Sequence, residues 1–200
     1  MRLVLDWDGT VTERDTLDLV LEEFGDKEIY ERVEAELEAG RMTLNEVIAA
    51  EFTTVTAPLE DVVRHVVQHA RIRPGFAELA RAWHPLVVSS GFRELIEPVL
   101  EQEGVLGEVE LRANGVEARP DGWRVDFRVS QICAECGEAC KRGDLPTGVE
   151  VVYAGDGHSD HCVSLAADRV FATDGLARWL DERAVPYRPL TDFHTLAAEL

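Results

Sequence analysis

Short apolar runs recur along the chain, and each ends at polar residues or glycine. The runs are Leu3–Leu5, Leu86–Val88, Val149–Ala154 and Arg169–Ala172. Runs of this length without polar alternation are typical of strands that are buried on both faces, as in a parallel sheet. Between them the periodicity is helical. The pattern therefore predicts an α/β fold with a central parallel sheet.

Residues 13–73 show no strand signal and instead have apolar residues at helical spacing among many glutamates. The segment Thr43-Leu44-Asn45-Glu46 has the pattern of a capping box, and Pro58 can open the helix that follows. A helical block directly after the first strand would cover the strand ends. We therefore expect residues 13–73 to form a helical cap, and residues 1–12 and 74–200 to form the core.

The remainder of the chain returns to an alternation of helix and strand. Helices are expected over residues 75–84, 92–103, 175–184 and 192–200. Residues 116–129 alternate between apolar and polar around a Pro-Asp-Gly turn, which predicts a small antiparallel hairpin near the site. At 200 residues the chain is large enough for one well-buried core with an insertion.

Polar residues whose side chains can take part in catalysis follow these apolar runs or lie between them. In chain order they are Asp6 and Asp8, then Ser89 with Ser90 and Gly91, then Lys141, and finally Asp156 with Asp160. Since the carboxyl ends of parallel strands meet at one edge of a sheet, these groups are expected to form one site. Two carboxylates separated by one residue can divide the work there. One can attack as a nucleophile, the other can transfer a proton, and together they can hold a hard cation.

The formal net charge of −19 excludes nucleic acid as a partner, because nothing would neutralise its phosphate backbone. The same charge repels a phosphorylated substrate, so a local cation must reverse the field at the site. A Mg²⁺ ion and Lys141 would do so, and Lys27 is the only other lysine among 20 basic residues. No apolar run is long enough to span a bilayer, so we expect a cytoplasmic protein with no membrane partner.

The motifs, in this order, resemble those of the haloacid dehalogenase (HAD) superfamily of phosphatases with an aspartate nucleophile, over essentially the whole chain. Asp-x-Asp-x-Thr before a helical cap and Ser-x-Gly-Phe after the second strand are similar to its phosphoserine-phosphatase-like branch. Residues 72–92, the cysteines before Lys141 and the ending Val185-Pro186-Tyr187 are similar to methionine-salvage phosphatases acting on 2-hydroxy-3-keto-5-methylthiopentenyl-1-phosphate. The resemblance implies a Rossmann-like core and hydrolysis of a small phosphorylated metabolite.

The resemblance also implies a role for each motif. Asp6 would attack phosphorus and form an aspartyl-phosphate, while Asp8 would protonate the leaving alcohol and later activate water. Mg²⁺ would be held by the Asp6 carboxylate, the Asp8 backbone carbonyl and Asp156. Asp160 would hold a metal-bound water or orient the catalytic Lys141. The residues expected to bind the phosphoryl group or the rest of the substrate are Ser89 (also catalytic), Gly9, Thr10, Asp15, Ser90 and Gly91.

Substrate choice is expected to depend on the cap and on the loop after Asp8. Phosphoserine phosphatases use an acidic residue and a cap arginine to bind the two charges of the amino acid. Asp15 lies near the first position, but Arg41 is the only arginine between residues 41 and 55. An unpaired carboxylate is costly to bury, so a neutral metabolite is favoured. The alternatives are a phosphoserine phosphatase or phosphotransferase of the same superfamily, and a non-catalytic phosphate-binding regulatory module.

Four cysteines raise a separate question. Cys133, Cys136 and Cys140 precede Lys141, and Cys162 follows the last motif. Their spacing differs from that of a zinc ribbon, yet the three thiols together with Cys162 or a histidine could bind a structural Zn²⁺. Reduced structural thiols are a second interpretation. A disulfide, which an ordinary cytosol disfavours, is a third.

Overall fold

The computed structural model describes residues 1–200 and is organised around a seven-stranded sheet. The strands are β1 (Arg2–Leu5), β2 (Leu86–Phe92), β3 (Glu110–Glu117), β4 (Arg124–Asp126), β5 (Val151–Gly155), β6 (Arg169–Ala172) and β7 (Arg188–Pro189). Their order across the sheet is β4-β3-β2-β1-β5-β6-β7, and only the β3–β4 pair is antiparallel. The predicted α/β class with a central parallel sheet is confirmed.

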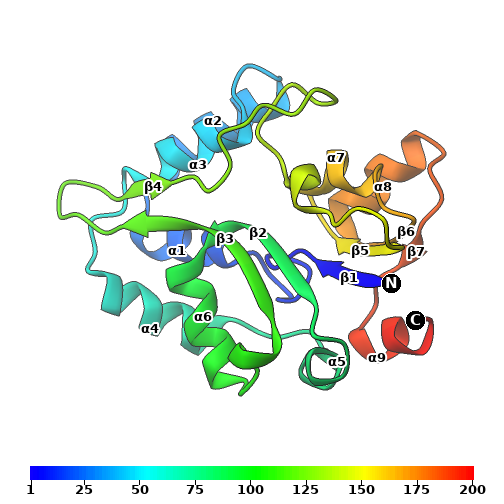
Figure 1. The fold of residues 1–200 in the computed structure, drawn as a ribbon. Helices are drawn as coiled ribbons and strands as arrows, with labels where there is room; N and C mark the ends of the chain where they lie inside the picture. The colour runs from blue at the N-terminus through cyan, green and yellow to red at the C-terminus, as the bar shows by residue number, and fades with distance from the viewer.

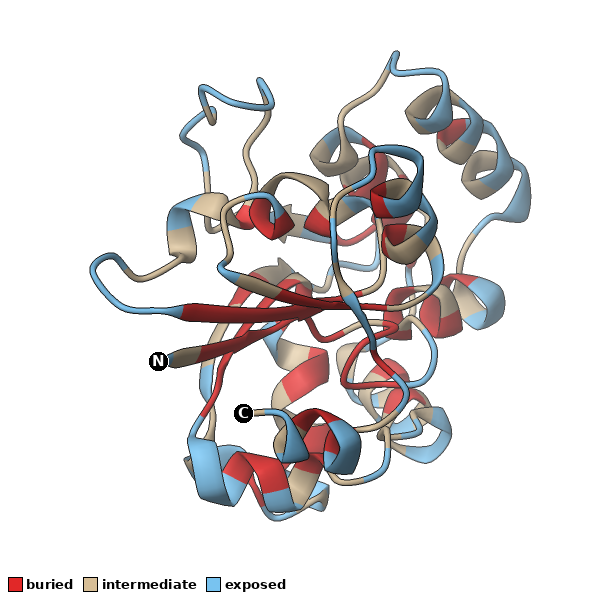
Figure 2. Ribbon diagram, turned by 90° about the vertical axis from the view of Figure 1, so that its right-hand side faces the viewer, coloured by how far each residue is buried: buried red, intermediate tan, exposed pale blue.

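Helices cover both sides of this sheet, which runs edge-on through the middle of the molecule in Figure 2. The helices are α1 (Thr16–Phe24), α2 (Lys27–Glu38), α3 (Leu44–Phe52), α4 (Leu59–His69), α5 (Phe76–Trp83), α6 (Arg93–Gln102), α7 (His161–Ser164), α8 (Asp174–Glu182) and α9 (Phe193–Ala198), with short 3₁₀ turns η1 (Leu106–Glu108), η2 (Lys141–Asp144) and η3 (His158–Asp160). No helix is both long enough and apolar enough to cross a membrane.

The middle strand β1 is fully enclosed, and its side chains alternate between two hydrophobic clusters. Leu3 and Leu5 belong to the larger cluster of 30 buried residues, which includes residues of α5, α6 and α9. Val4 points the other way, into a cluster with Tyr153 and Val163. Burial on both faces explains the unbroken apolar sequence of this strand. It also gives the residues that follow β1 a rigid support.

The helices α1–α4 lie between β1 and β2 in the chain, and the two ends of this insertion meet beside β1. Thr12 and Ile72 form an isolated antiparallel bridge. The backbone N–H of Glu13 donates to the Arg71 carbonyl at 2.8 Å, and that of Arg73 donates to Val11 at the same distance. Figure 1 shows α2 and α3 on one side of the molecule and α4 beside α6 on the other. The division of the chain into a cap (residues 13–73) and a core stays a prediction.

The start of α3 follows the predicted capping-box chemistry. The Thr43 hydroxyl accepts from the Glu46 backbone N–H at 3.3 Å, and the Glu46 carboxylate accepts from the Thr43 backbone N–H at 2.8 Å. Two backbone donors that the first helical turn leaves free are thereby satisfied. The capping box fixes where α3 begins, and so fixes which of its side chains face the core.

The strand β3 is longer than the hairpin pattern predicts. Its first half pairs in parallel with β2, and only residues 115–117 pair with β4 across the Pro-Asp-Gly turn. The turn lies against α3 rather than beside the strand-end carboxylates. The Trp123 backbone N–H donates to the Phe52 carbonyl at 3.0 Å, and its indole N–H donates to Ala57 at 2.9 Å. The turn therefore braces the insertion, whereas Arg128 and Val129, which follow β4, line a small pocket with Ser89 and Lys141. The position of the hairpin near the site stays a prediction.

Candidate active site

Asp6 and Asp8 leave β1 on a tight turn at the centre of the sheet. The Trp7 carbonyl accepts from the backbone N–H groups of Thr10, Val11 and Thr12. Gly9 has φ +71°, and a Cβ at this position would overlap the Asp156 carboxylate. Only glycine combines this left-handed backbone with so close an approach. The turn therefore brings the carboxylates after β1 against those after β5.

Lys141 connects the first and last motifs at the floor of the site. Its Nζ donates to Asp6 Oδ1 at 2.5 Å and to Asp160 Oδ1 at 2.8 Å, and all three side chains are buried. Burial alone would lower the pKa of Lys141, but the two carboxylates raise it above its ordinary value. The lysine is therefore charged, and it neutralises part of the negative charge around Asp6.

Asp160 is held by donors on every side. Besides Lys141, it accepts from the Tyr153 hydroxyl at 2.6 Å and from the backbone N–H groups of Asp156 and Gly157 at 2.8 and 3.1 Å. Burial disfavours its charged form, yet Lys141 and these donors lower the pKa of Asp160. A carboxylate with all its oxygens engaged in this way is suited to orienting Lys141.

Asp8 is surrounded by hydroxyl and amide donors. Its Oδ1 accepts from the Thr16 backbone N–H at 2.9 Å and from the Thr16 hydroxyl at 2.5 Å, and Oδ2 accepts from Ser89 at 3.3 Å. Burial nevertheless raises the pKa of Asp8 above its ordinary value. A carboxyl whose pKa is raised toward neutrality can donate a proton and take it back, as a general acid and base must.

The carboxylate oxygens of Asp6, Asp156 and Asp160 lie within 4.8 Å of one another. Burial, together with repulsion from Asp160, raises the pKa of Asp156 to about 7. One lysine does not balance three carboxylates. Hard oxygen donors that carry excess negative charge fit Mg²⁺. Donors engage both oxygens of Asp160. In Asp6 and Asp156 they engage Oδ1 alone, so the second oxygen of each of these two carboxylates is the one suited to hold the ion.

The structure also places the predicted phosphate-binding residues. Ser89 accepts from the Gly91 backbone N–H at 2.8 Å, and a Cβ on Gly91 would lie 2.6 Å from Asp8 Oδ2. Ser90 and Gly91 line a pocket above the carboxylates. The Thr10 hydroxyl donates to Asp156 at 3.0 Å, and so it holds a carboxylate in place. Thr10 and Ser89 thus contact acidic side chains, while Ser90 and Gly91 line the pocket.

Asp15 has a structural task that the sequence interpretation did not include. Its side chain accepts from the backbone N–H groups of Leu17 and Asp18 at 2.7 and 3.3 Å and so forms the N-cap of α1. Burial, with repulsion from Asp8 and Asp18, raises its pKa well above the ordinary value. Asp15 still lines the pocket, but its Oδ1 is committed to the helix.

Three further residues act on the site and were missed from the sequence. Thr16 clamps Asp8, Tyr153 donates to Asp160, and Arg73 donates to the carbonyls of Thr10 and Gly9 at 2.9 and 2.8 Å. Thr16 is also the first residue of α1. Thr16 could have been found from the sequence, because it carries a hydroxyl at the start of the first helix after the Asp6 and Asp8 pair. Tyr153 and Arg73 had no such local signal.

The pocket above the carboxylates has a volume of about 220 Å³ and is closed by residues of α1, α2 and α3. One part of its wall is aliphatic, formed by Leu17, Leu21, Leu37, Leu44, Val47 and Ile48. Another part is acidic, formed by Asp15, Asp18, Glu34 and Glu51. No lysine or arginine lines it. Arg41 instead forms an ion pair with Glu36 at 2.5 Å on the surface.

The acidic wall is protonated more readily than ordinary carboxylates. Burial, together with repulsion from Glu34 and Asp18, raises the pKa of Glu51 to about 8. Burial also raises the pKa of Asp18 and of Glu34. Glu51 Oε1 is buried without a hydrogen-bond partner. A carboxyl that keeps its proton in this setting can donate a hydrogen bond to a keto or hydroxyl oxygen.

The raised pKa of Glu51 makes stability depend on pH. Between pH 4.5, the ordinary pKa of the unfolded chain, and about pH 8, the folded protein binds a proton that the unfolded chain releases. The free energy of unfolding therefore falls as pH rises through this range. Glu51→Gln, which cannot ionise, is expected to be about 2 kcal/mol more stable than the native protein at pH 8, with no gain near pH 4.5. This is about half of the ~4 kcal/mol that the full pKa shift would give, because solvent screens part of the effect.

Urea denaturation of both proteins at the two pH values measures this difference. Glu23→Gln, at an exposed position of α1, is the matched control and should change neither value. A gain for Glu51→Gln that is equal at both pH values would contradict the assignment, because ionisation of Glu51 would then not be its source.

Comparisons with known proteins identify the family of the chain. The haloacid dehalogenase-like hydrolase family matches residues 3–164. A 2-hydroxy-3-keto-5-methylthiopentenyl-1-phosphate phosphatase of Geobacillus thermodenitrificans is 28% identical, over 99% of this chain and 94% of that protein. One of the same name from Brevibacillus brevis is also 28% identical, over 96% of this chain and 91% of that protein.

Solved structures show the same fold. A substrate-bound phosphoserine phosphatase has a TM-score of 0.73 at 19% identity, with 100% of this chain and 98% of that chain covered. A phospho-aspartyl intermediate analogue of phosphoserine phosphatase has a TM-score of 0.72 at 19% identity, with 99% and 97% covered. The chain belongs to the haloacid dehalogenase-like hydrolases, as the resemblance implied. Within that family it is an enzyme of the phosphatase class.

Proposed function

We propose that the protein is a Mg²⁺-dependent phosphomonoesterase whose substrate is uncharged apart from its phosphate. The observation that carries this proposal is the pocket wall, which joins aliphatic and acidic residues and includes no lysine or arginine. A substrate carboxylate would find no lysine or arginine there and would face repulsion from the acidic residues. Binding it would require desolvation without compensation.

The first chemical step follows from the positions of Asp6 and Asp8. An Asp6 carboxylate oxygen attacks phosphorus, and the P–O bond to the leaving alcohol breaks. Asp8 donates its proton to the oxygen of the leaving alcohol. Lys141, 2.5 Å from Asp6, offsets the charge that develops on the phosphoryl group. The product is an aspartyl-phosphate on Asp6, and the difficult hydrolysis is thereby divided into two easier steps.

The second step reverses the role of Asp8. Asp8, now a carboxylate, takes a proton from a water molecule that attacks phosphorus, and the P–O bond to Asp6 breaks. Inorganic phosphate leaves, and Asp8 is again protonated for the next turnover. Mg²⁺, held by the Asp6 carboxylate, the Asp8 backbone carbonyl and Asp156, would supply positive charge that draws the phosphate into an acidic site. The hydroxyl of Ser90, which lines the pocket, would orient a phosphoryl oxygen.

We infer that the substrate is 2-hydroxy-3-keto-5-methylthiopentenyl-1-phosphate, the compound named for the two relatives. Its keto and hydroxyl oxygens can accept from the protonated carboxyls of residues such as Glu51. Its methylthio end suits the aliphatic wall, because a thioether is apolar and adapts its shape to neighbouring side chains. Phosphoserine, by contrast, carries a carboxylate for which this pocket offers no lysine or arginine.

The test is a comparison of kcat/KM for this metabolite, phosphoserine and phosphoethanolamine, in Mg²⁺ and in chelator. An unpaired carboxylate costs several kcal/mol and each ~1.4 kcal/mol is tenfold, so we expect phosphoserine to be at least about a hundredfold poorer. Chelator should abolish turnover of every substrate. Comparable values for the metabolite and phosphoserine would overturn the inference on substrate, and a preference for phosphoethanolamine would show that the acidic wall binds a cation.

A further inference from the structure

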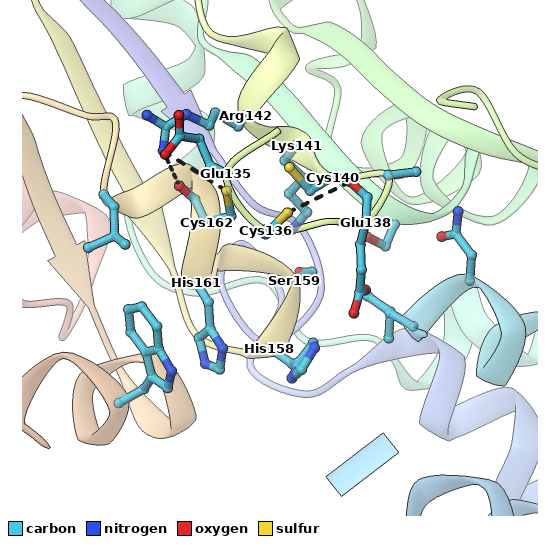
Figure 3. A pocket seen from close by; sticks show the side chains of 16 residues that line it. Glu135, Cys136, Glu138, Cys140, Lys141, Arg142, His158, Ser159, His161 and Cys162 are labelled. Carbon is cyan, nitrogen blue, oxygen red and sulfur yellow. Dashed lines mark hydrogen bonds between the residues drawn. The ribbon is translucent and has the colours of Figure 1, made fainter. Parts of the chain in front are cut away.

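The four cysteines converge on one point beside Lys141. Cys133, Cys136 and Cys140 lie on the loop before η2, and Cys162 lies on α7. Their sulfur atoms are all within 4.8 Å of one another, and those of Cys133 and Cys162 are 3.9 Å apart. In Figure 3, Cys136, Cys140 and Cys162 surround the start of η2 from two elements that are distant in sequence. Residues from two separate segments thus form one cluster of sulfur atoms.

The separation of the sulfur atoms matches metal binding better than a disulfide. A Zn–S bond of about 2.3 Å in a tetrahedron places neighbouring sulfur atoms about 3.8 Å apart. A disulfide needs about 2.05 Å, and all four cysteines are free. Four sulfur ligands in a tetrahedral cluster are typical of structural zinc, where no position stays open for a substrate.

The loop that carries Cys133, Cys136 and Cys140 forms a tight turn between Cys133 and Glu138. The Cys133 carbonyl accepts from the Gly137 backbone N–H at 2.9 Å, and the Cys133 N–H donates to the Glu138 carbonyl at 2.8 Å. Gly137 has φ +78°, a conformation that glycine adopts at no steric cost. Backbone N–H groups of Cys136 and Glu135 are directed at the Cys133 sulfur. The turn therefore supplies backbone donors to one sulfur atom of the cluster.

Hydrophobic packing near the cysteines does not explain why this loop is ordered. It contains no helix or strand between β4 and η2, and its one large aliphatic side chain near the cysteines, Ile132, is 61% exposed. A long loop without secondary structure needs another source of order. A metal ion bound to all four sulfur atoms would tie the loop to α7 and supply it.

A compensating cation lies next to the cluster. Four thiolates around a divalent ion leave two negative charges, and the Arg142 guanidinium donates to the Cys162 carbonyl at 3.4 Å and reaches its sulfur at 4.0 Å. Figure 3 shows Arg142 directed toward Cys162. The neighbouring Lys141 points the other way, to Asp6. Arg142 is therefore available to offset the charge of the sulfur cluster.

We propose that Cys133, Cys136, Cys140 and Cys162 bind a structural zinc ion, separate from the magnesium site. Each thiol that binds loses its proton to solvent, so the metal acquires four thiolate ligands. Cys140 directly precedes Lys141, and Cys162 follows Asp160 by two residues. The zinc ion thus joins the two segments that carry the lysine and its carboxylate partner, and takes no part in the reaction itself.

The test measures the zinc and iron content of the untagged protein by inductively coupled plasma mass spectrometry. We expect about one zinc ion per chain and no iron. Cys136→Ser and Cys140→Ser should each lose most of the zinc, while Glu138→Gln in the same loop and Asp156→Asn at the magnesium site should keep it. Cobalt in place of zinc should give the visible absorption of tetrahedral thiolate coordination, which needs no catalysis to observe.

Limited proteolysis at Arg128 and Arg142 reports the order of the loop. Cleavage there should accelerate once zinc is removed, while far-ultraviolet circular dichroism shows that the rest of the chain is folded. Protein that is purified without metal, is folded, and has four freely titrating thiols would overturn the proposal. Zinc that is retained in both cysteine variants, or iron bound in place of zinc, would also overturn it. So would an intact-protein mass about 2 Da lower for each pair of cysteines, which indicates a disulfide.

Discussion

Asp6→Asn should abolish turnover and leave the fold intact. Asparagine has nearly the shape of aspartate but cannot form the acyl-phosphate, so kcat is expected to fall by at least about ten-thousandfold, as when other catalytic nucleophiles are removed. Melting temperature should stay equal or rise, because burial and repulsion from Asp160 raise the pKa of Asp6 well above its ordinary value in spite of Lys141. Removing one of three crowded carboxylates relieves that repulsion.

Hydrolysis of an aryl phosphate, together with a thermal denaturation curve, measures both effects. Asp121→Asn is the matched control, since Asp121 lies in the exposed hairpin turn with a side chain that is 72% accessible, and its kcat should equal that of the native protein. More than a trace of turnover by Asp6→Asn, in a sample free of deamidated protein, would refute the nucleophile assignment.

Asp8→Asn should affect the two chemical steps differently. General acid–base catalysis contributes about a hundred- to ten-thousandfold, so kcat for an alkyl phosphate should fall by this amount. Nitrophenolate leaves without a proton, so with nitrophenyl phosphate the first step should proceed. The second step lacks its base. We therefore expect a burst of about one nitrophenol per enzyme, followed by slow turnover.

Stopped-flow absorbance records the burst, and acid quenching with mass spectrometry detects the phosphate on Asp6. Thr16→Val, which removes the hydroxyl that donates to Asp8 but keeps the carboxyl, provides the comparison and should show no burst. Equal losses for alkyl and aryl phosphates, with no burst, would mean that Asp8 does not protonate the leaving group.

The sequence was sufficient for the parts of the site that follow strands directly. Asp6, Ser89 and Asp156 each stand at the end of an unbroken apolar run, and the rule that parallel strands share a functional edge brings them together. The fold class was predicted for the same reason. Burial on both faces leaves a continuous apolar signal in strands such as β1 and β5.

Features that depend on distant contacts could not be found in this way. Tyr153 reads as one more apolar residue of β5 until its hydroxyl is seen at Asp160. The first half of β3 mixes Glu110, Leu111 and Arg112, because a strand next to the edge is only partly buried. Strand β7 spans two exposed residues, too few for any periodicity. In each case the deciding interaction is tertiary.

The meeting of Thr12 with Ile72 has an evolutionary consequence. An insertion whose two ends leave the core at neighbouring points can change its length and shape without displacing any core strand. Arg73 secures this junction through the Gly9 and Thr10 carbonyls, so the reactive turn keeps its form whatever lies between. Under the proposed function, substrate range and phosphoryl chemistry can therefore diverge separately. The former would change in the predicted cap, residues 13–73, and the latter in the residues that follow the core strands.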